Sequence, residues 1–117
     1  MGTTVLIVDD HRGFREGARR MLEAAGYVVV GEAADGASAL AAAERLHPQI
    51  VLLDIQLPDL DGFVVSERLA SDAHPPAVVL ISSRDESAYR QRLAASTARG
   101  FIAKSDLSGP ALATLVS

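Results

Sequence analysis

The sequence predicts a doubly wound α/β domain, with five parallel strands alternating with five helices. Short aliphatic runs recur at intervals of roughly 20 to 25 residues, separated by segments with apolar residues at helical spacing. Several of these runs stop at a polar residue, as Val51-Leu52-Leu53 does at Asp54. Continuous aliphatic runs are typical of strands buried on both faces. Right-handed crossovers between such strands place helices on both sides of one sheet.

Composition restricts the class of protein. A length of 117 residues suits one domain, and 49% hydrophobic residues with only 4% aromatic ones leave most core packing to Ala, Val and Leu. The absence of cysteine excludes disulfides and thiolate metal sites. Without an apolar run of about 18 residues or a secretion signal, a cytoplasmic location without membrane contact is expected. The net charge of −4 argues against nonspecific nucleic-acid binding by this chain alone.

Each element of the first half is predicted from its apolar pattern and its boundary residues. The first helix is expected to end at Gly26, which suits the C′ position, and the second cannot continue past Pro48. The second strand alternates less cleanly, which favours a place near the sheet edge. The expected strands are residues 5–8, 27–33 and 49–54, and the expected helices are residues 11–25 and 37–46.

The second half continues the alternation. The fourth helix carries few large apolar residues, so we expect it to be lightly anchored and mobile. Pro110 is a favoured first residue of the last helix, and Asp59 and Asp61 suit turn formation and capping of the third helix. The expected helices are residues 62–70, 85–95 and 110–117, and the expected strands are residues 77–81 and 100–103.

Some charged residues are interpreted as structural. His11 follows the acidic pair and is assigned an ordinary place in the first turn of the first helix. The arginines of that helix are interpreted as a solvated face, with partner binding as the lesser alternative. They are Arg12, Arg15, Arg19 and Arg20.

Five polar residues lie where predicted strands end: Asp9, Asp10, Asp54, Ser82 and Lys104, the only lysine. In a parallel sheet these ends share one edge. Each pair of like charges there costs about 4 kcal/mol at ~4 Å and an effective dielectric of ~20, so a divalent cation, Lys104 or both must offset the charges. Oxygen ligands select Mg²⁺, which suits phosphoryl chemistry. One carboxylate then serves as the nucleophile, and the lysine and serine hold the phosphoryl oxygens.

In this order and spacing, the strand-end motifs resemble those of the receiver domain of two-component response regulators, the flavodoxin/CheY-like fold. The resemblance covers the whole chain, residues 1–117, and implies the strand order 2-1-3-4-5. Residues 10–17 and 104–107 are similar to the subfamily joined to LuxR/NarL-type helix-turn-helix output domains. The motifs are Val8-Asp9-Asp10, Leu53-Asp54 with residues 57–62, Ile81-Ser82-Ser83, and residues 100–104.

The resemblance implies a role for each site residue. Asp54 would accept a phosphoryl group from a phosphohistidine on a sensor histidine kinase, and Ser82 and Lys104 would contact that group. Phe101 would be the switch aromatic, turning inward as Ser82 moves. The implied protein ligands of Mg²⁺ are Asp10 directly, Asp9 largely through water, Asp54, and the main-chain carbonyl of Gln56.

The resemblance also implies partners. The domain would regulate an output, transcription in this subfamily, through an output domain absent from this chain or through a downstream protein. DNA would be bound only through such an absent helix-turn-helix domain. Homodimers would form through the last helices and strand. The domain would not be an enzyme with an external substrate, although it would catalyse its own phosphorylation and dephosphorylation.

The chain departs from the family pattern at several positions. Ser105 stands where many receivers have a proline with a cis bond, and a cis bond before serine costs about 2.5–4 kcal/mol. Thr97 stands where glycine is frequent. Gln56 and Arg84 occupy the two positions that tune dephosphorylation in this family. We hypothesise that Arg84 reaches the phosphoryl group or shields it from water.

Three other functions stay open at this point. A Mg²⁺-dependent phosphohydrolase using an aspartyl-phosphate would need a substrate pocket, for which the chain has little room. A nucleoside triphosphatase is weaker, because no Gly-rich loop with lysine is present. A phosphorylation-independent binding module would not require the complete set of acidic residues.

Overall fold

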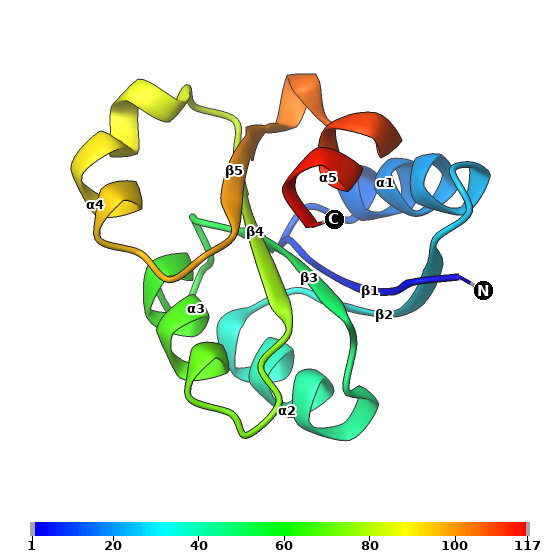
Figure 1. The fold of residues 1–117 in the computed structure, drawn as a ribbon, viewed down its shortest axis with the longest axis horizontal. Helices are drawn as coiled ribbons and strands as arrows, with labels where there is room; N and C mark the ends of the chain where they lie inside the picture. The colour runs from blue at the N-terminus through cyan, green and yellow to red at the C-terminus, as the bar shows by residue number, and fades with distance from the viewer. Residues whose placement is uncertain (1, 117) are drawn as a thin grey trace.

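The computed structural model describes residues 2–116 and shows a five-stranded parallel sheet with helices on both faces (Figure 1). The sheet order is β2-β1-β3-β4-β5, which confirms the predicted order and the edge position of the second strand. The strands are β1 (Thr4–Val8), β2 (Val28–Ala33), β3 (Ile50–Asp54), β4 (Ala77–Ser82) and β5 (Gly100–Ala103).

The predicted helices are present, with one correction. The fourth is divided into a 3₁₀ turn and a five-residue α-helix, because Tyr89 adopts φ −125° and ψ 16° between them. A second 3₁₀ turn, which the sequence pattern did not predict, follows β5. The elements are α1 (Arg12–Ala24), α2 (Gly36–Leu46), α3 (Gly62–Ala70), η1 (Glu86–Tyr89), α4 (Arg90–Ala94), η2 (Lys104–Asp106) and α5 (Gly109–Val116).

The core consists of two layers, one on each face of the sheet. Alternate residues of β1 show the division: Val5 and Ile7 pack with α1 and α5, whereas Leu6 and Val8 pack with α2 and α3. Figure 1 shows α1 and α5 together on one side and α2, α3 and α4 on the other. Burial on both faces is the reason the central strands β1 and β3 consist mostly of aliphatic residues.

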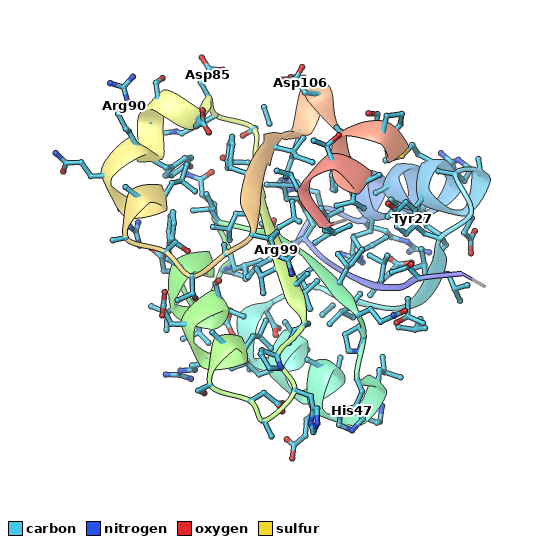
Figure 2. All side chains as sticks on the ribbon, viewed as in Figure 1. Tyr27, His47, Asp85, Arg90, Arg99 and Asp106 are labelled. Atoms are coloured by element: carbon cyan, nitrogen blue, oxygen red, sulfur yellow. The ribbon has the colours of Figure 1, made fainter. Side chains whose placement is uncertain are left out.

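The fourth-helix region is lightly anchored. None of the residues of α4 is buried, and Tyr89 is the one buried residue of η1. Figure 2 shows Asp85 and Arg90 at the periphery of this segment. These observations agree with a helix held by few core contacts, while its mobility stays a prediction.

Two helix ends depend on aspartates. Asp61 caps α3 as predicted, accepting a hydrogen bond from Phe63 N at 2.8 Å. Asp59, by contrast, accepts hydrogen bonds from Gly36 N (2.7 Å) and Ala37 N (3.0 Å), which lowers the pKa of its carboxyl. It therefore caps α2 across the loop, a tertiary contact beyond the predicted turn.

The positions of two arginines of α1 contradict the prediction that these arginines form a solvated face. Arg15 and Arg19 are not a solvated face, because their Nε atoms lie 3.0 Å and 2.8 Å from the Glu32 carboxylate on β2. The hydrogen bond from Arg19, assisted by Arg15, lowers the pKa of Glu32 despite partial burial. These two ion pairs attach α1 to the edge strand.

Smaller predictions are settled by the backbone. Gly26 adopts φ +95° after α1, as expected of a C′ glycine. No cis peptide bond occurs among residues 2–116, so the bond before Ser105 is trans. Within the same residues, no helix has the length and apolar character needed to cross a membrane.

Candidate functional site

The carboxyl edge of the sheet brings the predicted charges together. Asp9 follows β1, Asp54 ends β3, and Lys104 follows β5 as the first residue of η2. The Lys104 Nζ lies 2.6 Å from Asp9 Oδ2 and 3.3 Å from Asp54 Oδ2. Both carboxylates are buried, with Asp9 fully inaccessible and Asp54 at 3% exposure. One ammonium therefore bridges two carboxylates that have little access to water.

The site is electrostatically strained. Burial raises the pKa of Asp54, and the neighbouring charge of Asp9 adds to the effect, while the Gln56 N–H and Lys104 oppose it. Burial alone would lower the pKa of Lys104, but the contact with Asp9 and the charges of both carboxylates raise it. The lysine is thus held as a cation, and Asp54 carries a charge that its surroundings only partly compensate.

A divalent cation fits this arrangement. Asp9 Oδ2 is buried and, among residues 2–116, accepts no well-directed hydrogen bond, although Lys104 forms an ion pair with it. One ligand atom from each of Asp9, Asp10, His11 and Asp54 lies within 4.8 Å of the others. Carboxylate oxygens in this number suit Mg²⁺. The predicted ligands Asp9, Asp10 and Asp54 are therefore together.

His11 was underestimated by the sequence interpretation. Its ring Nδ1 lies 3.2 Å from Asp9 Oδ1 and 3.1 Å from Asp10 Oδ1. Its main-chain N–H donates a hydrogen bond to Asp9 Oδ1 at 2.8 Å. The feature of the sequence that could have predicted this contact is the position of His11 directly after Asp9 and Asp10. The histidine organises the acidic loop in addition to preceding α1.

Gln56 lies beside Asp54, as its position predicts. Its N–H donates to Asp54 Oδ1 at 3.1 Å, and the residue forms an isolated bridge with Asp61. The N–H orients the carboxylate that faces Lys104. The role of its carbonyl as a metal ligand stays a prediction.

Ser82 ends β4 and is completely buried. Its Oγ is 3.0 Å from the Tyr89 hydroxyl and accepts a hydrogen bond from Arg84 N at 3.1 Å. Tyr89 was missed because it is one aromatic residue inside a predicted helix without a clear apolar face. Arg84 is exposed and reaches Ser82 through its main chain.

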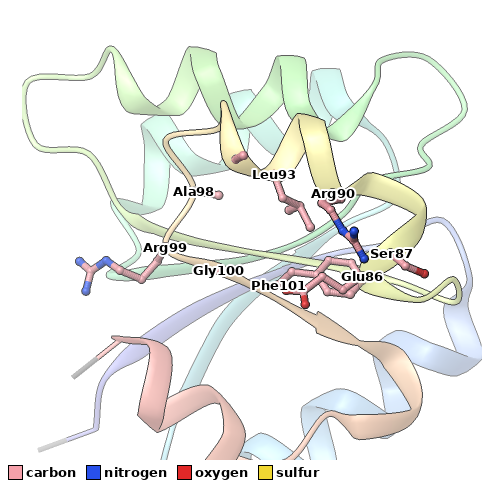
Figure 3. A pocket seen from close by; sticks show the side chains of 9 residues that line it. Glu86, Ser87, Arg90, Leu93, Ala98, Arg99, Gly100 and Phe101 are labelled. Carbon is pink, nitrogen blue, oxygen red and sulfur yellow. The ribbon is translucent and has the colours of Figure 1, made fainter.

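Phe101 is half-buried on β5. Its ring centroid is 6.1 Å from that of Tyr89, which in turn is 6.1 Å from that of Phe63. Figure 3 shows Phe101 and Leu93 facing the pocket between α4 and β5, while Arg99 points away. The predicted switch aromatic therefore lines a pocket beside α4, a helix without a buried residue.

Two residues of α1 support the site, a role that the sequence did not predict for either of them. The Lys104 Nζ lies 4.7 Å from the centroid of the Phe14 ring, a cation–π contact. Arg15 Nη1 donates to the Asp9 carbonyl at 2.7 Å. Together they hold the lysine and the acidic loop against α1.

Comparison with known proteins agrees with this geometry. Residues 5–113 match the family described as the response regulator receiver domain. The chain is 43% identical over 101 residues to the probable transcriptional regulatory protein NarL of Mycobacterium tuberculosis, covering 86% of this chain and 47% of that protein. It is 38% identical over 104 residues to the virulence regulator BvgA of Bordetella pertussis, covering 89% and 50%.

Solved structures give the same result. The signal receiver domain of the putative response regulator NarL from Mycobacterium tuberculosis superposes with a TM-score of 0.85 at 34% identity, covering 97% of this chain and 96% of that one. A LuxR-family two-component response regulator from Aurantimonas sp. SI85-9A1 gives 0.85 at 29% identity, with coverages of 97% and 81%. The chain spans about half the length of the curated relatives it matches.

Proposed function

Because this chain belongs to the response regulator receiver domain family, we propose that Asp54 is its phosphoacceptor and that a sensor histidine kinase supplies the phosphoryl group. The observation that carries the proposal is the Lys104 ammonium between Asp9 and Asp54, at 2.6 Å and 3.3 Å, on the carboxyl edge of the sheet. Such an edge is where open α/β sheets bind ligands. The chain is thus the regulatory, phosphoryl-receiving part of a two-component system.

In the proposed transfer, an Asp54 carboxylate oxygen attacks phosphorus while the bond from phosphorus to the donor histidine breaks. The Gln56 N–H on Oδ1 and Lys104 near Oδ2 orient the carboxylate. A bound Mg²⁺ would supply neutralising charge for the phosphoryl oxygens. Asp9, Asp10, Asp54 and the Gln56 carbonyl would hold it, with His11 beside the acidic pair.

After transfer, Ser82 and Lys104 would contact the phosphoryl oxygens, and Phe101 would turn inward. The phosphoryl group adds negative charge and strong acceptors, which favour movement of hydroxyl and ammonium groups toward it. We propose that the domain catalyses its own phosphorylation and dephosphorylation without an external turnover substrate. The segment of η1 and α4, with few buried residues, would carry the conformational change.

The proposed output is transcription, because the relatives NarL and BvgA are named as transcription regulators. DNA contact would come from a helix-turn-helix domain outside residues 1–117, and homodimers would form through the last helices and strand. The cytoplasmic location predicted from the sequence stays a prediction.

The test is intact mass before and after incubation with acetyl phosphate and Mg²⁺. The wild type should gain one phosphoryl group, and Asp54→Asn should gain none while keeping its fold. Equal labelling of Asp54→Asn, or no labelling of the wild type, would contradict the proposal.

The same assay followed over time tests whether Arg84 tunes the rate of dephosphorylation. Arg84→Ala should change the half-life of the phosphorylated form, and an unchanged half-life would show that Arg84 has no such role.

A further inference from the structure

We propose that Tyr89 is a positioning residue whose phenol competes with the phosphoryl group on Asp54 for the Ser82 hydroxyl. The inference rests on the proposed function and adds a regulatory contact to the same site. Its starting observation is the 3.0 Å contact between Ser82 Oγ and the Tyr89 hydroxyl. Ser82 is fully buried and Tyr89 is only 7% exposed, so water does not readily replace either partner.

The orientation of the Ser82 hydroxyl limits what it can contact at once. A serine hydroxyl has one hydrogen and two acceptor lone pairs, and the Arg84 N–H already occupies a lone pair at 3.1 Å. Phosphoryl oxygens only accept, so Ser82 must direct its hydrogen to them. One lone pair is left, with which Ser82 can accept from Tyr89, so the competition is one of geometry. The contact with Tyr89 holds Ser82 in one rotamer, and a phosphoryl group requiring another rotamer must break this contact.

The release of Tyr89 has a direct structural consequence. Its ring packs between Phe63 of α3 and Phe101 of β5, with both centroid separations at 6.1 Å. It is also the last residue of η1 and the N-cap of α4, in the non-helical conformation that divides the two. A shift of the phenol therefore moves the Phe101 packing surface and the start of α4 together.

Tyr89 differs from Phe101 in the chemistry it contributes. Phe101 has no hydroxyl and couples to the site only through ring packing, whereas Tyr89 offers a hydroxyl directly to Ser82. The two aromatics belong to different elements, η1 and β5. The unphosphorylated state is thus stabilised by a polar contact that the phosphorylated state loses.

The first experiment is a titration with beryllium fluoride and Mg²⁺, in which beryllofluoride on Asp54 stands for the phosphoryl group. Tyr89→Phe keeps the ring and removes the competing hydroxyl, so it should lower the midpoint about fivefold, the size expected for one hydrogen bond. In the Ser82→Ala background, the same substitution should leave the midpoint unchanged. Tyr27→Phe, on the opposite face of the sheet, is the matched control and should also leave it unchanged.

A second measurement needs no change at Tyr89. The chain has two tyrosines and no tryptophan, so Tyr27→Phe leaves Tyr89 as the only residue excited in the tyrosine absorption band. Its emission should change on addition of beryllium fluoride and Mg²⁺, and should not change in Asp54→Asn carrying the same background. Constant emission on binding would overturn the proposal.

The outcomes separate this inference from the proposed function. If the wild type binds beryllofluoride and is phosphorylated on Asp54, but Tyr89→Phe titrates as the wild type does, Tyr89 has no positioning role. An effect of Tyr89→Phe that persists in Ser82→Ala would also overturn the inference, because it would not act through Ser82. If the wild type neither binds beryllofluoride nor is phosphorylated, the proposed function itself is wrong.

Discussion

At the scale of single residues, the site is organised by an imbalance of charge. Asp9 and Asp54 are buried, yet they share the single ammonium of Lys104. Burial therefore raises the pKa of Asp54 even with that lysine in contact. A buried carboxylate whose charge is only partly compensated destabilises the fold. Such a group is more typical of a functional site than of a purely structural one.

The first prediction concerns Asp54 and pH in metal-free buffer. A carboxyl whose folded pKa lies above its ordinary value of 3.8 binds more protons in the folded state, so stability falls as pH rises through this interval. Asp54→Asn removes the effect and should unfold at a higher temperature than the wild type at pH 7.

The control for that prediction is the same comparison at a pH well below 3.8, measured by thermal unfolding with a chelator present. There Asp54 is protonated in both states, and the advantage of Asp54→Asn should disappear. An advantage of equal size at both pH values would show that ionisation of Asp54 is not its cause.

At the scale of elements, helix ends and loops place the site. The loop from β3 to α3 follows Asp54 directly, and Asp59 and Asp61 attach it to the N-termini of α2 and α3. Gly62 brings α3 so close to β3 that an added Cβ would lie 2.5 Å from the Asp54 carbonyl oxygen and from Ile55 Cα. The absence of a side chain at Gly62 thus permits the close approach of α3 and the Asp54 main chain.

The second prediction uses this close approach. Gly62→Ala should destabilise the domain by about 2–3 kcal/mol, because main-chain atoms must move to admit the methyl group. Gly17→Ala is the matched control within α1, where an added Cβ meets nothing within 4 Å. It should stabilise the domain by about 0.5–1 kcal/mol through helix propensity. Urea unfolding measures both, and equal effects would contradict the argument.

At the scale of the whole molecule, the parallel sheet brings together residues from distant parts of the chain. Asp10, Asp54 and Lys104 lie at or just after the ends of β1, β3 and β5, and they meet only because parallel strands share a carboxyl edge. A cation bound there would link β1 to β3 and hence stabilise the folded state as a unit.

The third prediction follows from that linkage. Mg²⁺ at about ten times its dissociation constant should stabilise the wild type by about 1.4 kcal/mol, or about 6 °C in the unfolding temperature. Asp10→Asn should lose most of this gain. Asp72→Asn, which lies after α3 at the opposite edge, should keep it. Equal gains in both variants would place the cation elsewhere.

The sequence alone was sufficient for the architecture and for the location of the site. Aliphatic runs such as Val51-Leu52-Leu53 predict buried parallel strands, and strand ends in such a sheet must share an edge. The set Asp9, Asp10, Asp54 and Lys104 could therefore be predicted as neighbours, and the distances confirm that Lys104 reaches both buried carboxylates.

Only the tertiary structure decided which side chains bind one another across elements. The contact of Tyr89 with Ser82, the capping of α2 by Asp59 and the pairing of Arg15 with Glu32 have no periodic signal. Periodicity reports which face of an element is buried, because burial of apolar surface depends on the local repeat. A hydrogen bond between distant residues depends instead on the packing of whole elements, which local patterns do not encode.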